Sequence, residues 1–301
     1  MFAEITGAFV LQNLPESQVE LAGEVPYSAV LPYRQIALKH IAEHLELPGF
    51  RPGKVPVDMA RKKVGELAVL EEAVELFVKD FYIELIEAHK IEAVGRPDIR
   101  VTKLAVGNPV GLTVRATVYP EVALPKNWKQ LHEKIALEPY SGELPKMKVP
   151  PSPEEEQKAR EYLAKDKRRG RLIEALLEKS TLSVPRIFIE SELEKIMAQM
   201  REDVKRFGME FEEYLKKTNK TEGAVRDDFR EQAAKRAKLQ LVLNKIAQEE
   251  KLEADETAVA TEIKHAMEHF PDANPELVKI HIETVLKNEL ALKLLEGEVK
   301  P

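Results

Sequence analysis

The chain has 301 residues, with 46 Lys and Arg against 52 Asp and Glu, a formal net charge of −6 and no cysteine. This length allows one large domain or two modest ones, and the missing cysteine excludes disulfide scaffolds, thiol catalysis and cysteine-ligated zinc. Charged residues make up 33% and aromatic residues 6%, which favours a helix-rich protein with a solvated surface, while the negative charge argues against a dedicated nucleic-acid binder.

Two pairs of strands are predicted in the first 119 residues. Apolar residues occupy every second position at 19–25 and again at 110–118, the period of a strand with one buried face. Weaker strand patterns cover 5–11 and 99–104. The alternation indicates a sheet in which one face is covered by other elements.

Helical patterns lie between these strands. Apolar spacings of three and four predict one helix that begins between 28 and 32 and ends near 45, and a longer one through 67–85. The order of strands, helices and strands predicts an α+β domain at 1–119, with helices packed on an antiparallel sheet.

Proline marks the next segment. Seven of the 19 prolines fall in the 34 residues from Pro120 to Pro153, and each removes a backbone donor and fixes φ. We therefore predict a proline-rich extended linker over 120–153.

The remaining residues, 154–301, show only helical spacing and predict an all-α domain. No fixed-period repeat relates the helices, so a solenoid is not indicated. Pro275 suits the first position of the last helix. Apolar stripes at steps of three and four residues cover 189–211, 225–246, 259–270 and 275–292.

Common catalytic and metal-binding motifs are missing. There is no Gly-x-Ser-x-Gly elbow and no Gly-x-Gly-x-x-Gly turn, and the glycines of the segment 49–55 are too close for a phosphate-binding loop. Two histidine pairs, His40 with His44 and His265 with His269, have i, i+4 spacing, but solvated helix faces are the expected explanation for both. We predict no catalytic residue, no metal and no cofactor.

The most informative segment is Gly49–Pro56, which reads Gly-Phe-Arg-Pro-Gly-Lys-Val-Pro. Its glycines and prolines favour a tight turn that presents Phe50, Arg51 and Lys54 at a tip. Residues 49–63 carry five basic side chains and one acidic one, a net charge of +4 that leaves −10 for the rest of the chain. An aromatic side chain beside two cations suits docking on an anionic partner, and incidental charge on a helix–helix turn is the alternative.

These eight residues resemble the ribosome-docking signature of the bacterial trigger factor family. The surrounding strands and helices agree with that family, and further likeness lies at 173–177, 189–193 and 229–233, so the resemblance covers nearly the whole chain. Members typically carry a prolyl-isomerase domain between the two halves. Here only the proline-rich segment and a charged helical stretch at 154–171 stand in that place.

The resemblance implies a ribosome-associated molecular chaperone without catalysis. It would dock near the nascent-chain exit tunnel, with Arg51 and Lys54 on rRNA phosphates or acidic side chains and Phe50 in an apolar crevice. The partners implied are the large ribosomal subunit, through rRNA and ribosomal protein, and unfolded or nascent polypeptides; homodimer formation stays open. The ribosome-binding residues implied are Gly49, Phe50, Arg51, Pro52, Gly53 and Lys54.

The helical domain would form arms around a cradle that shields unfolded polypeptide. Flexible, polarizable methionine suits such a surface, although an apolar helical stripe more often packs in a core. The substrate-binding candidates are Met197, Met200, Phe207, Met209 and Phe211.

Two other functions stay open, a peptidyl-prolyl isomerase acting on folding chains and a non-ribosomal export chaperone with a related helical domain. No stretch reaches the roughly 20 apolar residues of a membrane span, and Glu4 at the N-terminus is not preceded by a basic region. We therefore expect a cytoplasmic protein without membrane contact.

Overall fold

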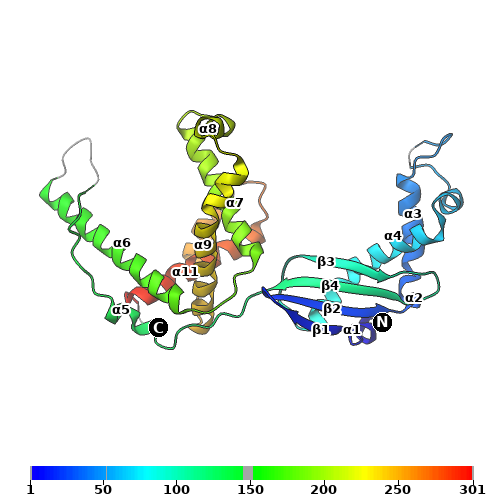
Figure 1. Ribbon diagram of the computed structural model, residues 1–301, viewed down its shortest axis with the longest axis horizontal. Helices are drawn as coiled ribbons and strands as arrows, with labels where there is room; N and C mark the ends of the chain where they lie inside the picture. The colour runs from blue at the N-terminus through cyan, green and yellow to red at the C-terminus, as the bar shows by residue number, and fades with distance from the viewer. Residues whose placement is uncertain (1, 52, 145–151, 300–301) are drawn as a thin grey trace. The chain divides into compact units, whose positions relative to one another are not determined.

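The computed structural model describes residues 2–51, 53–144 and 152–299. The chain divides into two compact units, with the boundary in the sequence between Pro120 and Glu121; one unit contains a sheet and the other consists mainly of helices (Figure 1). This is the expected fold class, α+β followed by all-α. In the part of the chain that the structure describes, no helix is both long and apolar enough to cross a membrane.

The sheet of the first unit has four antiparallel strands in the order β1-β2-β4-β3. In the central pair, Leu21 lies opposite Val114 and Val25 opposite Val110, and all four side chains are buried. Because successive residues alternate between faces, this register gives the sheet one apolar face. The strands are β1 (Val10–Leu14), β2 (Gln18–Val25), β3 (Ala93–Lys103) and β4 (Val110–Val118).

The weak strand pattern at 5–11 is wrong at its start. Residues Phe2–Thr6 form the short helix α1, and β1 begins at Val10. Ile5 in α1 and Phe9, which follows the turn after α1, are both buried in the main core of this unit. The apolar residues at the start of this pattern therefore belong to a helix and a turn packed on that core and not to a strand.

Helices cover the apolar face of the sheet. The long helix α4 (Val57–Ala88) packs Phe77 and Phe81 against Leu21 and Leu112, and the rings of Phe77 and Phe81 stack with centres 5.0 Å apart. It is interrupted at Gly65, where φ is 83° and ψ is 166°, a conformation that glycine adopts without steric strain. Two shorter helices precede it, α2 (Tyr27–Val30) and α3 (Tyr33–His44).

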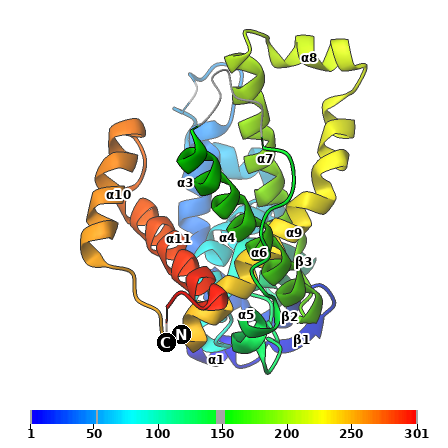
Figure 2. The same ribbon diagram turned by 90° about the vertical axis from the view of Figure 1, so that its left-hand side faces the viewer.

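The second unit is helical throughout its core. Figure 2 shows α7 and α9 side by side with α8 across their end, and α10 beside α11. Side-chain caps begin several helices, including a capping box in which Ser152 and Glu155 bond each other's backbone N–H. The helices are α5 (Leu131–Lys134), α6 (Pro153–Lys179), α7 (Arg186–Arg206), α8 (Phe211–Thr218), α9 (Glu222–Glu249), α10 (Glu256–His269) and α11 (Pro275–Glu296), with a 3₁₀ turn η1 (Trp128–Gln130).

Part of the segment expected as an extended linker over 120–153 is folded into this unit. Val122, Trp128 and Leu131 are buried in the core formed by α6, α9 and α11. Ala123 and Thr181 exchange two backbone hydrogen bonds, at 3.0 and 3.1 Å, in a short antiparallel bridge. Regular structure in this segment is limited to the short elements η1 and α5, but the apolar side chains between the prolines still pack against the helices. Residues 145–151 lie outside the described residues.

The apolar stripe at 189–211 is divided between two helices. Helix α7 ends at Arg206 and α8 begins at Phe211. Gly208 between them has a φ of 77°, which turns the chain at a position that glycine tolerates. The periodicity continues across the turn because both helices pack on the same apolar cluster.

Candidate functional site

The segment 45–56 connects α3 to α4 and is anchored at its base. Val55 is buried with Ala42 of α3 and Ala60 of α4, and Leu45 and Leu47 pack against this cluster. The apolar side chains on both sides of the loop therefore hold the ends of two helices together. They leave the described residues between Leu47 and Val55 on the surface.

Two backbone turns shape the tip of this loop. Phe50 N–H donates to the carbonyl of Leu47 at 3.1 Å, and Lys54 N–H donates to the carbonyl of Arg51 at 3.0 Å. Gly49 and Gly53 have φ of 91° and 73°, values that residues with a Cβ rarely adopt. The two glycines thus fit the conformation that each turn requires. Pro52 lies outside the described residues.

The tip carries one apolar side chain beside two cations. Phe50 is 38% exposed, and Arg51 and Lys54 are also exposed. Neither cation forms an ion pair within the residues that the structure describes, whereas Arg61 on α4 pairs with Glu66. The charges of Arg51 and Lys54 are therefore available to an anionic surface, with an aromatic ring next to them.

A second candidate site is an apolar pocket on the hairpin of α7 and α9. Its volume is about 510 Å³, within the range of sites that bind small ligands or side chains. Met200, Phe207 and Met209 line it together with Tyr214 of α8 and Phe229 of α9. Asp203 and Arg236 add one charge of each sign to the lining.

The structure divides the five substrate-binding candidates. Met200, Phe207 and Met209 line this pocket, and Phe207 is 88% exposed. Met197 and Phe211 are buried in the apolar cluster under it. One helical period contains residues of both groups, so spacing alone could not separate them.

Two aromatic residues of the lining, Tyr214 and Phe229, are not among the candidates that the sequence predicts. Phe229 belongs to the predicted stripe of α9, and Tyr214 stands three positions after Phe211. Both are aromatic residues at core spacing, and only the packing of α7, α8 and α9 places them on an open surface. The sequence offers one indication of this surface, the position of aromatic Tyr214 shortly after the turn at Gly208.

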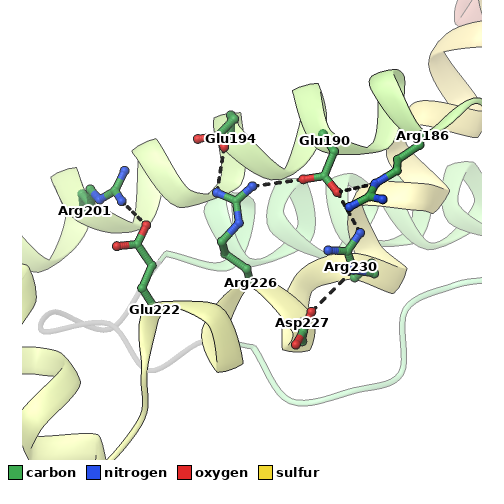
Figure 3. A network of polar contacts seen from close by, with 8 residues as sticks. All are labelled: Arg186, Glu190, Glu194, Arg201, Glu222, Arg226, Asp227 and Arg230. Carbon is green, nitrogen blue, oxygen red and sulfur yellow. Dashed lines mark hydrogen bonds and ion pairs between the residues drawn. The ribbon is translucent and has the colours of Figure 1, made fainter. Parts of the chain in front are cut away.

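The other flank of the hairpin carries an ion-pair ladder (Figure 3). Glu190 lies between Arg230 at 2.9 Å and Arg226 at 3.1 Å, and Arg226 also contacts Glu194 at 2.7 Å. The hydrogen bond from Arg230, with help from Arg226, lowers the pKa of Glu190. We call this set, with Arg186, Arg201, Glu222 and Asp227, the α7–α9 ladder.

The ladder and the pocket lie on opposite sides of the buried stripe of α7. At 3.6 residues per turn, Glu190 and Glu194 fall on one side of Met197. Asp203 and Phe207 fall on the other side. Ion pairs therefore join α7 to α9 on one flank of the hairpin, and the other flank carries the apolar pocket.

The chain matches two family models. The model described as bacterial trigger factor protein (TF) covers residues 8–143, and the model of the bacterial trigger factor protein (TF) C-terminus covers residues 153–299. Together they leave only nine residues, 144–152, between the matched segments.

Curated relatives named "Trigger factor" match part of the chain. The protein of Mycobacteroides abscessus is 36% identical over 115 residues, which are 38% of this chain and 24% of the relative. That of Saccharopolyspora erythraea is 34% identical over 115 residues, 38% of this chain and 25% of the relative. The match thus spans about a quarter of the length of these relatives.

A solved structure has a similar fold. It comes from work on promiscuous substrate recognition in folding and assembly activities of the trigger factor chaperone. The likeness covers 97% of this chain and 100% of that chain, with a TM-score of 0.53 and 14% sequence identity. At 14% sequence identity the comparison shows that the two folds are similar and shows nothing further.

Proposed function

The chain belongs to the bacterial trigger factor family, and on that premise we propose that it is a ribosome-associated chaperone. It docks near the nascent-chain exit tunnel through the loop Gly49–Pro56 and shields unfolded polypeptide on its helical arms. The observation that carries this proposal is the tip at Phe50, Arg51 and Lys54, where two cations without an ion pair among the described residues accompany an exposed ring.

Docking is proposed to combine charge with one apolar anchor. Arg51 and Lys54 contact phosphates of rRNA or carboxylates of a ribosomal protein, and Phe50 enters an apolar crevice. Gly49 and Gly53 keep the turn in its shape, so little order has to be gained on binding. Because phosphate contacts release counterions, the interaction weakens as salt concentration rises.

Holding of unfolded chains is proposed to use the open flank of the α7–α9 hairpin. Met200 and Met209 offer adaptable side chains to apolar segments of different shape, and Phe207 adds an exposed ring. Adaptable contacts of this kind hold many sequences weakly, because no fixed array of hydrogen bonds selects one of them.

Ribosome co-sedimentation tests the docking proposal. The variant F50A/R51A/K54A should no longer pellet with ribosomes at low salt, because both charge contacts and the apolar anchor are gone. The control K165A/K167A removes two exposed cations of α6, outside the basic segment 49–63, and should pellet like the wild type. Unchanged pelleting of the triple variant, with circular dichroism showing an intact fold, would refute docking through this loop.

A further inference from the structure

The structure separates two histidine pairs that are equivalent in the sequence. His40 and His44 lie one turn apart on α3, and their ring centres are 4.6 Å apart. His265 and His269 have the same spacing on α10, but within the described residues their rings form neither a mutual contact nor a hydrogen bond. Spacing alone therefore does not explain the arrangement on α3.

Both rings on α3 are held through the same nitrogen. His40 Nδ1 lies 2.6 Å from Oε1 of Glu72 on α4, and His44 Nδ1 lies 2.8 Å from the backbone carbonyl oxygen of His40. A carboxylate and a carbonyl can only accept, so each Nδ1 carries a proton and donates it. In the neutral rings the lone pair then resides on Nε2.

We propose that His40 and His44 together bind one divalent transition-metal ion through their Nε2 atoms. Metal-binding histidines usually donate the other ring N–H to a carboxylate or a backbone carbonyl, which orients the ring and raises its basicity. Glu72 and the carbonyl of His40 occupy those two positions. The proposal is independent of ribosome docking and of the α7–α9 pocket.

The ring spacing agrees with chelation. Two imidazoles that bind one ion at about 2.0–2.1 Å, with a ligand angle between square and tetrahedral, have ring centres about 4.5–5 Å apart, and the observed rings lie 4.6 Å apart with an interplanar angle of 64°. His40 is 50% exposed and His44 is also exposed, so an ion can enter from solvent. No group of three or more protein ligands is found in the described ranges, so water completes the coordination and the ion exchanges readily.

Imidazole nitrogen selects the class of ion. It suits Cu²⁺, Ni²⁺ and Zn²⁺, whereas Mg²⁺ and Ca²⁺ prefer oxygen ligands. For a given set of nitrogen ligands the affinity is highest for Cu²⁺. The site should therefore bind Cu²⁺ more tightly than Ni²⁺ or Zn²⁺ and should not respond to Mg²⁺.

Isothermal titration of the untagged full-length chain with CuCl₂, NiCl₂ and ZnCl₂, in a buffer that does not chelate metals, tests the site. The wild type should bind one ion per chain, and H40A or H44A should each weaken binding at least tenfold. The double variant H265A/H269A, with identical spacing, should bind like the wild type. Failure of all three metals to bind the wild type, or binding by H40A and H44A that is as tight as binding by the wild type, overturns the proposal.

Glu72→Ala tests the orienting contact while both imidazoles remain. Loss of a partner of this kind typically weakens metal affinity about 10- to 100-fold, and far-UV circular dichroism should show that α3 and α4 are intact. The Hε1 proton signals of His40 and His44 should shift on addition of Zn²⁺ in the wild type. Binding by E72A that is as tight as in the wild type would contradict the assigned geometry.

Discussion

Met197 and Phe207 stand ten positions apart on one apolar pattern, and their surroundings give them different roles. Met197 is fully buried beneath the α7–α9 pocket, whereas Phe207 is 88% exposed at its edge. A buried side chain contributes to stability through the contacts it fills, and an exposed ring is available to a ligand.

We predict opposite effects for the two alanine variants. M197A should lower the free energy of unfolding by about 2–5 kcal/mol, because it leaves a cavity in the cluster. F207A should change stability by no more than about 0.5 kcal/mol but reduce the suppression of aggregation of an unfolded test protein. Urea unfolding and light scattering measure the two effects. Equal loss of stability in both variants would contradict the division of roles.

At this scale the sequence predicts the exposed side chains Phe50, Arg51 and Lys54 of the loop better than the lining of the pocket or the contact within the histidine pair. The turns of this loop can be predicted because they depend on the glycines and prolines within residues 49–56 and not on distant contacts. His40 is oriented by Glu72, which is 32 positions away on another helix. No local pattern contains that contact, so the two histidine pairs look alike until α3 and α4 are packed together.

Among the helices, the α7–α9 hairpin depends on charge along the flank opposite its pocket. Glu190 accepts hydrogen bonds from Arg226 and Arg230, two cations one turn apart on α9. A single exposed ion pair contributes little to the free energy of unfolding, but a carboxylate shared by several arginines forms a network that contributes more. The pKa of Glu190 is lowered, chiefly by the hydrogen bond from Arg230.

We predict that E190Q makes the stability of the hairpin less sensitive to acid. A carboxyl whose pKa is lower in the folded state stabilises the fold above its unfolded pKa of about 4.3. That contribution is lost as the pH falls through the folded pKa. The wild type should therefore lose stability between pH 5 and pH 3, and E190Q should lose less over this window.

Urea unfolding followed by circular dichroism at several pH values measures this difference. At neutral pH, E190Q should be less stable than the wild type by roughly 1 kcal/mol. The control E231Q removes a carboxylate whose ion pair, with Lys235, lies within α9 itself, so it should have a smaller effect. Identical acid profiles for E190Q and the wild type would show that the ladder does not stabilise the hairpin.

The elements themselves are largely predictable, and their ends are not. Alternation gives β2 and β4, and three–four spacing gives α9 and α11, because each pattern matches one buried face. The break between α7 and α8 at Gly208 is invisible to periodicity, since Phe211 continues to pack on the same cluster. The burial of Trp128 and Leu131 is not predicted either, because the prolines around them indicate an extended segment while their side chains pack in the core of the second unit.

For the molecule as a whole, the two matched segments leave nine residues between them. A segment of that size cannot bury a core of its own, and this chain has no cysteine to supply a disulfide. The proposed chaperone activity therefore rests on binding by the two units and not on a catalytic domain between the matched segments.

We predict that the chain does not accelerate refolding that is limited by prolyl isomerisation. X–Pro isomerisation is slow without a catalyst, and the nine residues between the two matched segments are too few to form a separate isomerase domain. A denatured protein with proline-limited refolding measures this, with a known prolyl isomerase as the positive control. Acceleration proportional to chain concentration would establish enzymatic activity instead.

The bridge between Ala123 and Thr181 has a consequence for the insertion of extra residues into the second unit. It ties the chain at two points on either side of the segment between α5 and α6. Lengthening a closed loop adds only about 0.6 kcal/mol of entropy for each doubling. A folded module with neighbouring termini could therefore be grafted between residues 144 and 152 while Val122 and Leu176 keep their places in the core. Such an inserted module would be attached to the unit that carries the α7–α9 pocket. The interval between residues 144 and 152 is therefore a suitable position for inserting or exchanging a domain.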